Sequence, residues 1–547
     1  MRNAITEMAK RASRGIAMPA ALLILFLMVV LVGALMGIIN QELKEVAYTG
    51  YDNRALYLAD AGVEEMVSLA EEAAPGIAVQ PSPYNFPADS NGVDPQFAIN
   101  SLTTDFVDNR RTYLIDSEGI TSEGNTRYVQ AIAIQNTFAN YNYAGWSNAA
   151  GNYFVSGLMQ YNGPVYLGGG SSNPVNIWWQ DGDASIFESS VLAEGSVDWW
   201  TGSGEKTPST TADWLSVASG GSPAYSHTNT AIGFPPNAAN AIIASEAFAG
   251  LPNTTMPAPS NGNGVYVNGV LPTSLSSGGT LDTGIFVQGD ADISMSTSST
   301  TATPQTETIT FSPVSGETAS QTLTNTVTVT VNYTANTTSV QQGTSAAVTV
   351  NGVPSGDGTT SGASANGAIF VNGNVDSLAG TMSGQQTIAV PDNTNETNVN
   401  NIVISGDISY EHDPQTCSCT STDMLGIIGH NVEVASGAPA DLTIEGAVFA
   451  GNSQDYANQN GQGTFETQSN VFSLPLKGPL LVYGSLVNAA ISPLGVFNGS
   501  TGALAGGWGD SYTWDQRFKT QAPPFYPGES SFTIVAWYDC GTNNCSG

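Results

Sequence analysis

The side chains best suited to acid–base chemistry are scattered carboxylates in the distal half of the chain. Polysaccharide lyases and hydrolases need paired carboxylates, or a carboxylate beside an arginine or lysine base, on one face of the fold. The candidates are Asp290, Asp292, Asp376, Asp407, Glu411, Asp413 and Asp423. Asp is also a usual residue of solvent-facing turns, and cations are almost absent from this part of the chain. We therefore predict no catalytic residues, and a carbohydrate-active enzyme is the least favoured function.

Two imidazoles and one charged pair lie in the same half. His412 and His430 are each a lone histidine in a β-rich segment, which is typical of a surface or stacked residue rather than of a base. Asp515 and Arg517 follow an aromatic-rich run near the end of the chain. We expect this pair to cap the last rung of a β structure, whose edge would otherwise be open.

All four cysteines lie in the distal half as well. Cys540 and Cys545 close a short loop and could form a disulfide in an oxidising compartment, whereas Cys417 and Cys419 are spaced awkwardly for a mutual bridge. Four cysteines allow three full pairings, and the sequence does not choose among them. A zinc site is the alternative, but the chain has no CxxC pair. Calcium-binding EF-hand spacing is also missing, so we expect no metal and no cofactor.

The charge distribution excludes one large class of partner. The 547 residues carry a net charge of −33 with only 13 Lys plus Arg, and five of these precede residue 50. Phosphate binding needs clustered Lys and Arg, so a broad nucleic-acid surface is excluded. High Gly with plentiful aromatic and β-branched residues favours an all-β chain with many turns over a disordered one.

The elements that hold these residues begin with an apolar run. Twenty-four uncharged, mostly apolar residues extend from Ile16 to Ile39, enough to cross a bilayer as a helix. Lys10, Arg11 and Arg14 precede the run, so the positive-inside rule places the N-terminus in the cytoplasm and the rest of the chain outside. A cleaved secretory signal is the alternative, but its apolar region should be about 7–15 residues long. We predict a single-pass protein of the inner membrane.

The helix is expected to continue beyond the membrane. Apolar residues recur at steps of three and four after residue 40, and 55 proline-free residues separate Pro19 from Pro75. As one helix this stretch would span about 80 Å at ~1.5 Å per residue, with Gly50 and Gly62 as its weak points. Such a helix needs a domain of its own chain, or neighbouring copies, against its apolar stripe.

Three runs in this segment resemble a known family. They are Arg14-Gly15-Ile16-Ala17, Asn40-Gln41-Glu42 and Ala55-Leu-Tyr-Leu-Ala-Asp-Ala-Gly-Val-Glu64. Together they resemble the N-terminal segment of PilX-type minor pilins and related pilin-like proteins. The resemblance implies that prepilin peptidase cuts after Gly15, that Ile16 becomes the new N-terminus, and that other pilin-like subunits are partners. Major pilins carry a glutamate at the fifth mature position, which helps docking into the filament; here that position is Ala20.

The remaining chain reads as β structure. Short apolar stretches, each closed by a glycine, recur from residue 153 to 484 and favour an irregular parallel β-helix, with β-sandwich domains as the alternative. Residues 112–135 predict a β-hairpin that could cover the helix stripe. The Thr/Ser-rich residues 299–362 predict a β-hairpin arm projecting from the β-helix, or a low-complexity loop. Residues 363–528 resemble the β-helical domain of unknown function that commonly follows PilX-type N-termini.

These expectations combine into one organisation and one function. The predicted units are a basic leader (1–15), a transmembrane helix (16–39), its amphipathic continuation (40–74), a linker and hairpin adaptor (75–140), a first β-helical part (141–298), a Thr/Ser-rich insertion (299–362), a distal β-helical domain (363–528) and a cysteine-containing tail (529–547). We expect a pilin-like structural protein that is anchored in the bilayer through residues 16–39 and is not an enzyme. The alternative is a cell-surface adhesin that binds glycan or other cells.

Overall fold

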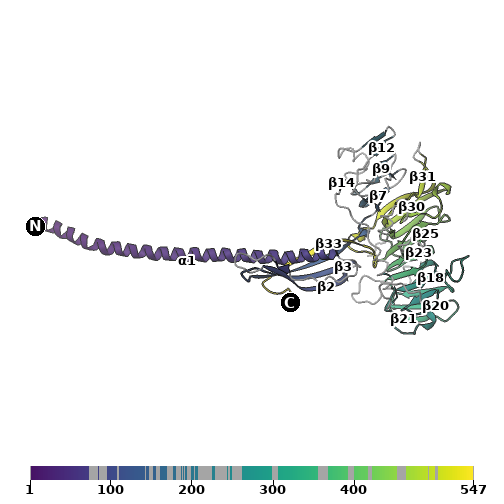
Figure 1. The fold of residues 1–547 in the computed structure, drawn as a ribbon, viewed down its shortest axis with the longest axis horizontal. Coiled ribbons are helices and arrows are strands. Elements are labelled where there is room, and N and C mark those ends of the chain that lie inside the picture. The colour runs from purple at the N-terminus through teal and green to yellow at the C-terminus, as the bar shows by residue number, and fades with distance from the viewer. Residues whose placement is uncertain are drawn as a thin grey trace.

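The chain forms one long helix, a five-stranded sheet beside it and a much larger β region beyond it, in a computed structural model of the whole sequence (Figure 1). The protein is mainly β, as the sequence predicts. The structure describes residues 2–72, 84–85, 95–107, 110–141, 143–146, 152–155, 160–168, 176–179, 186–187, 189, 191–193, 199–201, 204–206, 225–227, 243, 247–248, 262–298, 306–354, 367–391, 400–416, 422–451, 463–490, 492–498 and 503–545.

The helix α1 (Arg2–Glu72) is continuous over 71 residues, about 105 Å at ~1.5 Å per residue. It passes without interruption through Gly50 and Gly62, the two residues expected to weaken it. Its N-terminal part extends away from the rest of the molecule, and its last turns lie along a sheet (Figure 1).

That sheet, called sheet A here, is antiparallel in the order β1-β2-β3-β4-β33. Its strands are β1 (Tyr84–Asn85), β2 (Gln96–Val107), β3 (Arg110–Ile120), β4 (Thr126–Thr137) and β33 (Gly528–Gly541). Strands β3 and β4 form the hairpin that the sequence predicts at 112–135. The segment that reads as a cysteine-containing tail is mostly an edge strand of this sheet, so nearly 400 residues are inserted between β4 and β33.

The inserted β region is a single curled sheet, like half of a barrel, in which strands stack in parallel columns. The first column is β16 (Ile285–Gln288), β22 (Ala368–Asn372), β24 (Gln385–Ala389), β26 (Met424–Gly429), β28 (Leu442–Ala450), β30 (Leu476–Asn488), β5 (Tyr143–Trp146), β8 (Val165–Gly168), β11 (Val191–Ala193) and β14 (Tyr225–His227). The second column is β17 (Ala291–Thr297), β23 (Val375–Met382), β25 (Ile402–Tyr410), then β28, β30, β32 (Leu504–Trp514), β7 (Gln160–Asn162) and β10 (Ile186–Phe187). A short third column adds β27 (Val432–Val434) and β29 (Phe465–Thr467) to β25.

Smaller elements complete the described chain. They are β6 (Asn152–Val155) with β9 (Asn176–Trp179), β12 (Trp199–Thr201) with β13 (Gly204–Lys206), β15 (Gly264–Val267), β31 (Gly495–Phe497), and the short turns η1 (Phe138–Asn140), η2 (Pro272–Ser274), η3 (Val471–Ser473) and η4 (Gln516–Lys519).

In-register apolar ladders form the core of the columns. On one face of the first column, Ile285, Ile369, Ile388 and Ile427 are fully buried in the main core. On its other face Phe286 stacks on Phe370 with ring centres 5.9 Å apart, so this column is buried on both sides. Fully buried parallel strands are expected to read as continuous short apolar runs, which is the pattern in this sequence.

Glycines mark the corners because the neighbouring backbone comes close. At Gly484 φ is +151°, and a β-carbon there would lie 1.9 Å from the carbonyl oxygen of Gly446 on the adjacent strand. No other residue fits this position, so glycine is required at this corner.

The Thr/Ser-rich insertion does not project from the stack. Its strands β18 (Thr306–Ser312), β19 (Val327–Asn332), β20 (Thr337–Gln342) and β21 (Val348–Asn351) continue antiparallel from β17 at one end of the columns (Figure 1). Their alternation buries one face, including Ile309, Val329 and Val340, in the main core. The β structure predicted for this insertion is confirmed over residues 306–351. These strands form no loop and no free arm, because their alternating face has an apolar partner. We call β18–β21 the end cap.

The predicted first β-helical part, 141–298, is divided in space. Strands β5, β7, β8, β10, β11 and β14 stack beyond β30 and β32, whereas β15 to β17 lie at the opposite end, beside β22 and β23. The order of the strands in the columns therefore differs from their order in the chain. The first strands of the inserted chain lie next to its last ones.

Candidate functional site

The exposed part of α1 is the largest uncovered apolar surface in the described chain. Every residue from 21 to 50 is exposed, including Leu25 and Phe26 at 63% and 67%. By length and composition this helix could cross a membrane, a property that an N-terminal signal sequence shares. Lys10, Arg11, Arg14, Gly15, Ile16 and Ala20 lie within α1, while their side chains fall outside the described residues.

Beyond this stretch, the Ala55–Glu64 run lies in the part of α1 that packs on sheet A, which continues to Ala70. Ala59, Val63 and Met66 are fully buried against Ile115 and the neighbouring strands β3 and β4. The run is rich in small residues because helix and sheet are in close contact. A β-carbon on Gly119 of β3 would lie 2.0 Å from the carbonyl oxygen of Ala55.

A second glycine lies on the helix side of the same interface. A β-carbon on Gly62 would lie 2.2 Å from Ser117 Oγ, a side-chain atom, whereas the nearest neighbours of Gly119 are backbone atoms of the helix. The residue expected to weaken the helix therefore lies where the sheet comes close to it.

Charged residues of α1 hold the C-terminal strand in place. Asp60 accepts a hydrogen bond of 2.9 Å from Trp537 Nε1, and Glu71 accepts one of 3.1 Å from the backbone N–H of Phe532. Arg127 of β4 forms ion pairs with both Asp52 of α1, at 3.3 Å, and Asp539 of β33. This strand was not predicted from the sequence, although the apolar residues Phe532, Ile534 and Ala536 alternate as in a strand.

The cysteines divide between described and undescribed chain. Cys540 and Cys545 form a disulfide at the end of β33, with Cα atoms 5.3 Å apart. Cys417 and Cys419 lie outside the described residues.

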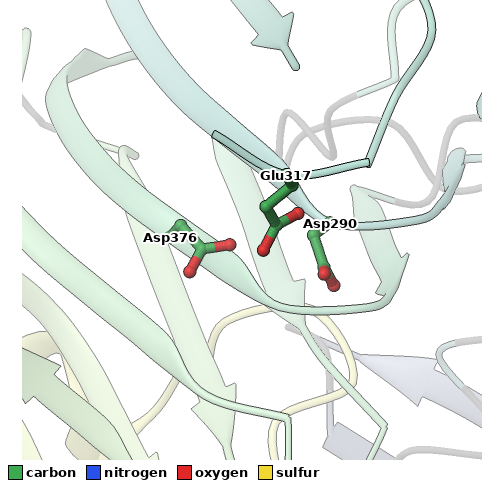
Figure 2. A group of neighbouring side chains, drawn as sticks. All are labelled: Asp290, Glu317 and Asp376. Atoms are coloured by element: carbon green, nitrogen blue, oxygen red, sulfur yellow. The ribbon is translucent and has the colours of Figure 1, made fainter. Parts of the chain in front are cut away.

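Three carboxylates converge at one end of the β region. Figure 2 shows Asp290, which follows β16, beside Glu317, which lies between β18 and β19, with Asp376 of β23 on the other side of Glu317. One oxygen of each lies within 4.8 Å of the others, and Glu317 Oε2 and Asp376 Oδ2 have no hydrogen-bond partner in the described chain. Burial, with Asp290 and Asp292 nearby, raises the pKa of Asp376 to about 6. Carboxylate oxygens suit a hard cation such as Ca²⁺, but the arrangement alone assigns no ion.

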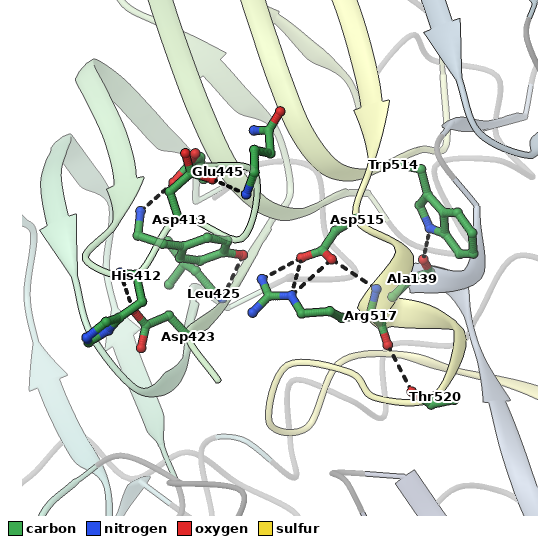
Figure 3. Close-up of polar contacts among 12 residues, drawn as sticks. Ala139, His412, Asp413, Asp423, Leu425, Glu445, Trp514, Asp515, Arg517 and Thr520 are labelled. Atoms are coloured by element: carbon green, nitrogen blue, oxygen red, sulfur yellow. Dashed lines mark hydrogen bonds and ion pairs between the residues drawn. The ribbon is translucent and has the colours of Figure 1, made fainter. Parts of the chain in front are cut away.

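A second polar cluster follows the corner between the second column and η4. Asp515 is fully buried and accepts 3.0 Å hydrogen bonds from the backbone N–H and the Nε of Arg517, so it caps η4 (Figure 3). The guanidinium lies 5.3 Å from the ring centre of Tyr410. Burial, more than the neighbouring Asp413, raises the pKa of Glu445 to about 7.

This pair does not cap the last rung, as the sequence analysis expected. Strand β32, which precedes Asp515, has β30 on one side and β7 on the other. The edge is therefore already covered, by residues from the beginning of the inserted chain. Asp515 and Arg517 instead fix the turn through which the chain leaves the columns.

His412 is held by a carboxylate, and His430 is buried. Asp423 Oδ2 lies 3.0 Å from His412 Nδ1 and accepts a 2.8 Å hydrogen bond from the His412 backbone N–H, while Asp423 Oδ1 accepts one of 2.7 Å from the Gly384 N–H (Figure 3). The Asp423 carboxylate therefore joins two turns of adjacent strands. His430 is 1% exposed.

The other candidate carboxylates are dispersed. Asp407 accepts from the backbone N–H of Thr443, Glu411 accepts from the hydroxyl of Thr297, Asp413 accepts from the backbone N–H of Gln415, and Asp292 is half-buried with a raised pKa caused by burial. A buried acid that the sequence analysis did not single out is Glu307 of the end cap. It accepts hydrogen bonds from Tyr333 Oη and Gln386 Nε2, and burial raises its pKa to about 8. Its place in an alternating Thr-Glu-Thr-Ile-Thr strand, on the apolar face, is the signal that could have found it.

The first site gathers three carboxylates without a cation, and the second pairs a buried carboxylate with an arginine that caps a turn. The most extended feature of the described chain is the exposed part of α1 together with the sheet A on which its last turns pack. Comparisons with protein families, with curated proteins and with solved structures find no match to this chain.

Proposed function

We propose that this chain is a membrane-anchored, pilin-like structural protein that presents its β region outside the cytoplasm. The observation that carries the proposal is the continuity of α1. The exposed apolar part of α1 continues without a break into its C-terminal part, which is packed on an antiparallel sheet. An anchor of this kind fixes the attached domain directly to the bilayer, with no flexible linker between them.

The charges around the apolar run give the anchor its direction. Lys10, Arg11 and Arg14 precede the run, and Glu42 and Glu45 follow it, so the N-terminus belongs in the cytoplasm of a single-pass inner-membrane protein. The resemblance to PilX-type minor pilins adds cleavage after Gly15 by prepilin peptidase and assembly with other pilin-like subunits. Ala20 at the fifth mature position leaves the protein without the glutamate that major pilins use for docking.

Mass spectrometry of the mature N-terminus tests this proposal. In cells with active prepilin peptidase we expect Ile16 as the first residue, and we expect Gly15→Leu to leave the leader attached. Gly33→Leu is the control, since it lies within the apolar run and should be processed normally. An intact Met1 would refute the pilin-like function, and a cut beyond Ile39 would identify a secretory signal.

We also propose that the columns of the β region belong to an irregular parallel β-helix. In-register parallel pairing over successive strands, with glycine corners, supports it. An electron-microscopy map of the purified β region that resolves two facing antiparallel sheets would favour the sandwich instead.

A cell-surface adhesin that binds neutral glycan is the second candidate. The outer face of the end cap favours it, because hydroxyls line up in one row across five strands. The row is Ser296, Thr308, Thr330, Ser339 and Thr349, all partly or fully exposed. These side chains are uncharged, in a chain whose net charge of −33 would repel polyanions.

Glycan-array binding tests the adhesin. Thr308→Asp with Thr330→Asp adds charge to the middle of the row without touching the buried face, and should abolish binding to neutral glycans. Ser274→Asp with Ser276→Asp adds the same charge at exposed positions outside the row and should leave binding unchanged. Equal loss in both pairs, or no binding by the unaltered protein, would reject this function.

A further inference from the structure

We infer that the β region is joined to the anchored helix through a rigid, two-stranded neck, so that its orientation relative to α1 is fixed. The inference concerns the connection itself and holds whether or not the protein enters a filament. The neck consists of the chain leaving β4, residues 138–141, and the chain entering β33, residues 518–527.

The two crossings lie side by side. Thr137 at the end of β4 is paired with Gly528 at the start of β33. One residue further, the N–H of Phe138 donates a 3.2 Å hydrogen bond to the carbonyl oxygen of Pro527. The antiparallel pairing of sheet A therefore continues into the neck, and neither crossing can swing without the other.

The outgoing crossing is held by buried contacts with the columns. Phe138 is 1% exposed, and its ring meets that of Phe449 edge-on at 6.3 Å. Its carbonyl oxygen accepts a hydrogen bond from Ser485 Oγ at 3.3 Å, and the next carbonyl, of Ala139, accepts one from Trp514 Nε1 at 3.0 Å. A hinge here would have to expose an aromatic side chain and break both hydrogen bonds.

The returning crossing is held against the same strand. Tyr526 is 4% exposed, its hydroxyl donates to the carbonyl oxygen of Val448 at 3.1 Å, and its ring meets Phe449 edge-on at 6.1 Å. Phe449 of β28 is thus clamped between the two crossings. Phe138, Phe449 and Tyr526 belong to one buried cluster.

One arginine of sheet A adds a link across the neck. Arg110 of β3 is 8% exposed, and its Nε donates to the carbonyl oxygen of Gln135 at 2.9 Å. Its Nη1 lies 3.4 Å from the carbonyl oxygen of Lys519, the last residue of η4. Domains joined by a single exposed linker move independently as a rule. Here two paired crossings, a buried aromatic cluster and a buried arginine replace that linker.

The geometry also distributes tension. Both crossings leave the same end of sheet A, so a pull on the β region loads β4 and β33 together. Because β4 and β33 are pulled in the same direction, the force does not slide one past the other. The force is instead transmitted to β3 and α1, along the length of the strands. In such a connection many hydrogen bonds between neighbouring strands share the force and would have to break together.

Distance measurements on the full chain in detergent test the neck. Genetically encoded spin labels replace two exposed residues, Glu65 of α1 and Thr349 of the end cap. Double electron–electron resonance then measures the distance between the labels, which depends on the orientation of the β region. We expect one narrow distance distribution. Phe138→Ala with Tyr526→Ala should broaden it at least twofold, whereas Phe472→Ala, at a side chain that is 79% exposed, should leave it unchanged. A broad distribution in the unaltered protein would overturn the inference.

If the aromatic variants fail to fold, cleavage of one of the two crossings offers a second test of the neck. A specific protease site inserted after Tyr141 severs the outgoing chain and leaves the returning one. The fragments stay together in any case because β33 remains paired with β4, so the readout is again the distance between the two spin labels. We expect the cleaved protein to keep the narrow distribution, since the buried contacts of Phe138 and Tyr526 remain. A broad distribution after cleavage would show that chain continuity, rather than the neck, fixes the orientation.

Discussion

Where α1 meets sheet A, small residues bring the two elements into contact, and a cation lies between two carboxylates. Where the strands of the β region stack, large apolar side chains form ladders, and several carboxylates are buried with no cation beside them. Arg127 pairs with both Asp52 and Asp539 in the first region. In the second, burial raises the pKa of Glu307 to about 8 and that of Asp510 to about 6.

The difference separates the forces that each region depends on. The helix–sheet module (residues 51–72 of α1 with sheet A) depends on close backbone approach, so its stability should respond to added volume. The β region depends on neutral buried carboxyl groups, so its stability should respond to pH. Each of the following variants disturbs one region and leaves the other as an internal reference.

The largest effect is expected from Gly119→Ala. Its added β-carbon would lie 2.0 Å from the Ala55 carbonyl oxygen and 2.4 Å from the Ala59 nitrogen, both backbone atoms that cannot rotate away. Overpacking a core usually costs 1–3 kcal/mol, and we expect a loss of about 3 kcal/mol or more in the free energy of unfolding of the module. Denaturant unfolding monitored by limited proteolysis of the helix–sheet module measures it.

Gly437→Ala is the matched control, since a β-carbon there has no atom within 4 Å. It should leave both regions within ~0.5 kcal/mol of the unaltered protein. If Gly119→Ala is equally silent, the helix does not rest on β3 as closely as described.

The next effect is the pH dependence of the β region, tested with Glu307→Gln. The folded-state pKa of Glu307 is raised from 4.5 to about 8 by burial, so the folded protein binds the proton more tightly than the unfolded chain. The stability that this proton contributes is complete below pH 4.5 and is lost as pH rises towards 8. Between pH 5 and 7.5 we expect a loss on the order of 3 kcal/mol, at 1.36 kcal/mol per pKa unit.

Denaturant unfolding at pH 5, 6 and 7.5 measures this slope. Glu307→Gln should remove the share that Glu307 supplies, leaving the smaller share of Glu445 and Asp510, whose pKa values are also raised by burial. Asp407→Asn, at an exposed carboxylate, should leave the slope as it is. An identical slope in Glu307→Gln and the unaltered protein would contradict the neutral state of this carboxyl.

The same comparison explains how far the sequence could lead. Local patterns were sufficient for α1, for the hairpin of β3 and β4, and for the short glycine-closed strands, because each depends on periodicity or on one corner residue. The end cap was misjudged because alternation in a Thr-rich strand shows one apolar face, but not what that face meets.

The features that the sequence did not reveal depend on contacts across hundreds of residues. Strand β33 joins β4 nearly 400 residues away, and β5 stacks on β30 across a similar distance. No local signal specifies such partners. The carboxylates Asp290 and Asp376 were candidates from the sequence, but only the fold brings Glu317 beside them.

The smallest effect separates the two kinds of electrostatics. Arg127→Met removes the cation between Asp52 and Asp539, whose side chains are 40% and 28% exposed. Partly exposed ion pairs are worth about 0–1 kcal/mol, so we expect a loss of about 1 kcal/mol in the module at low salt. Salt screens the attraction, so the unaltered module should lose part of this increment at 0.5 M NaCl, while Arg127→Met should be nearly insensitive to salt. The β region should keep its pH slope in both proteins, because the proton on Glu307 depends on burial rather than on a charged partner. A variant in which both regions weaken together would instead place Arg127 in the path that couples the module to the β region through β4 and β33.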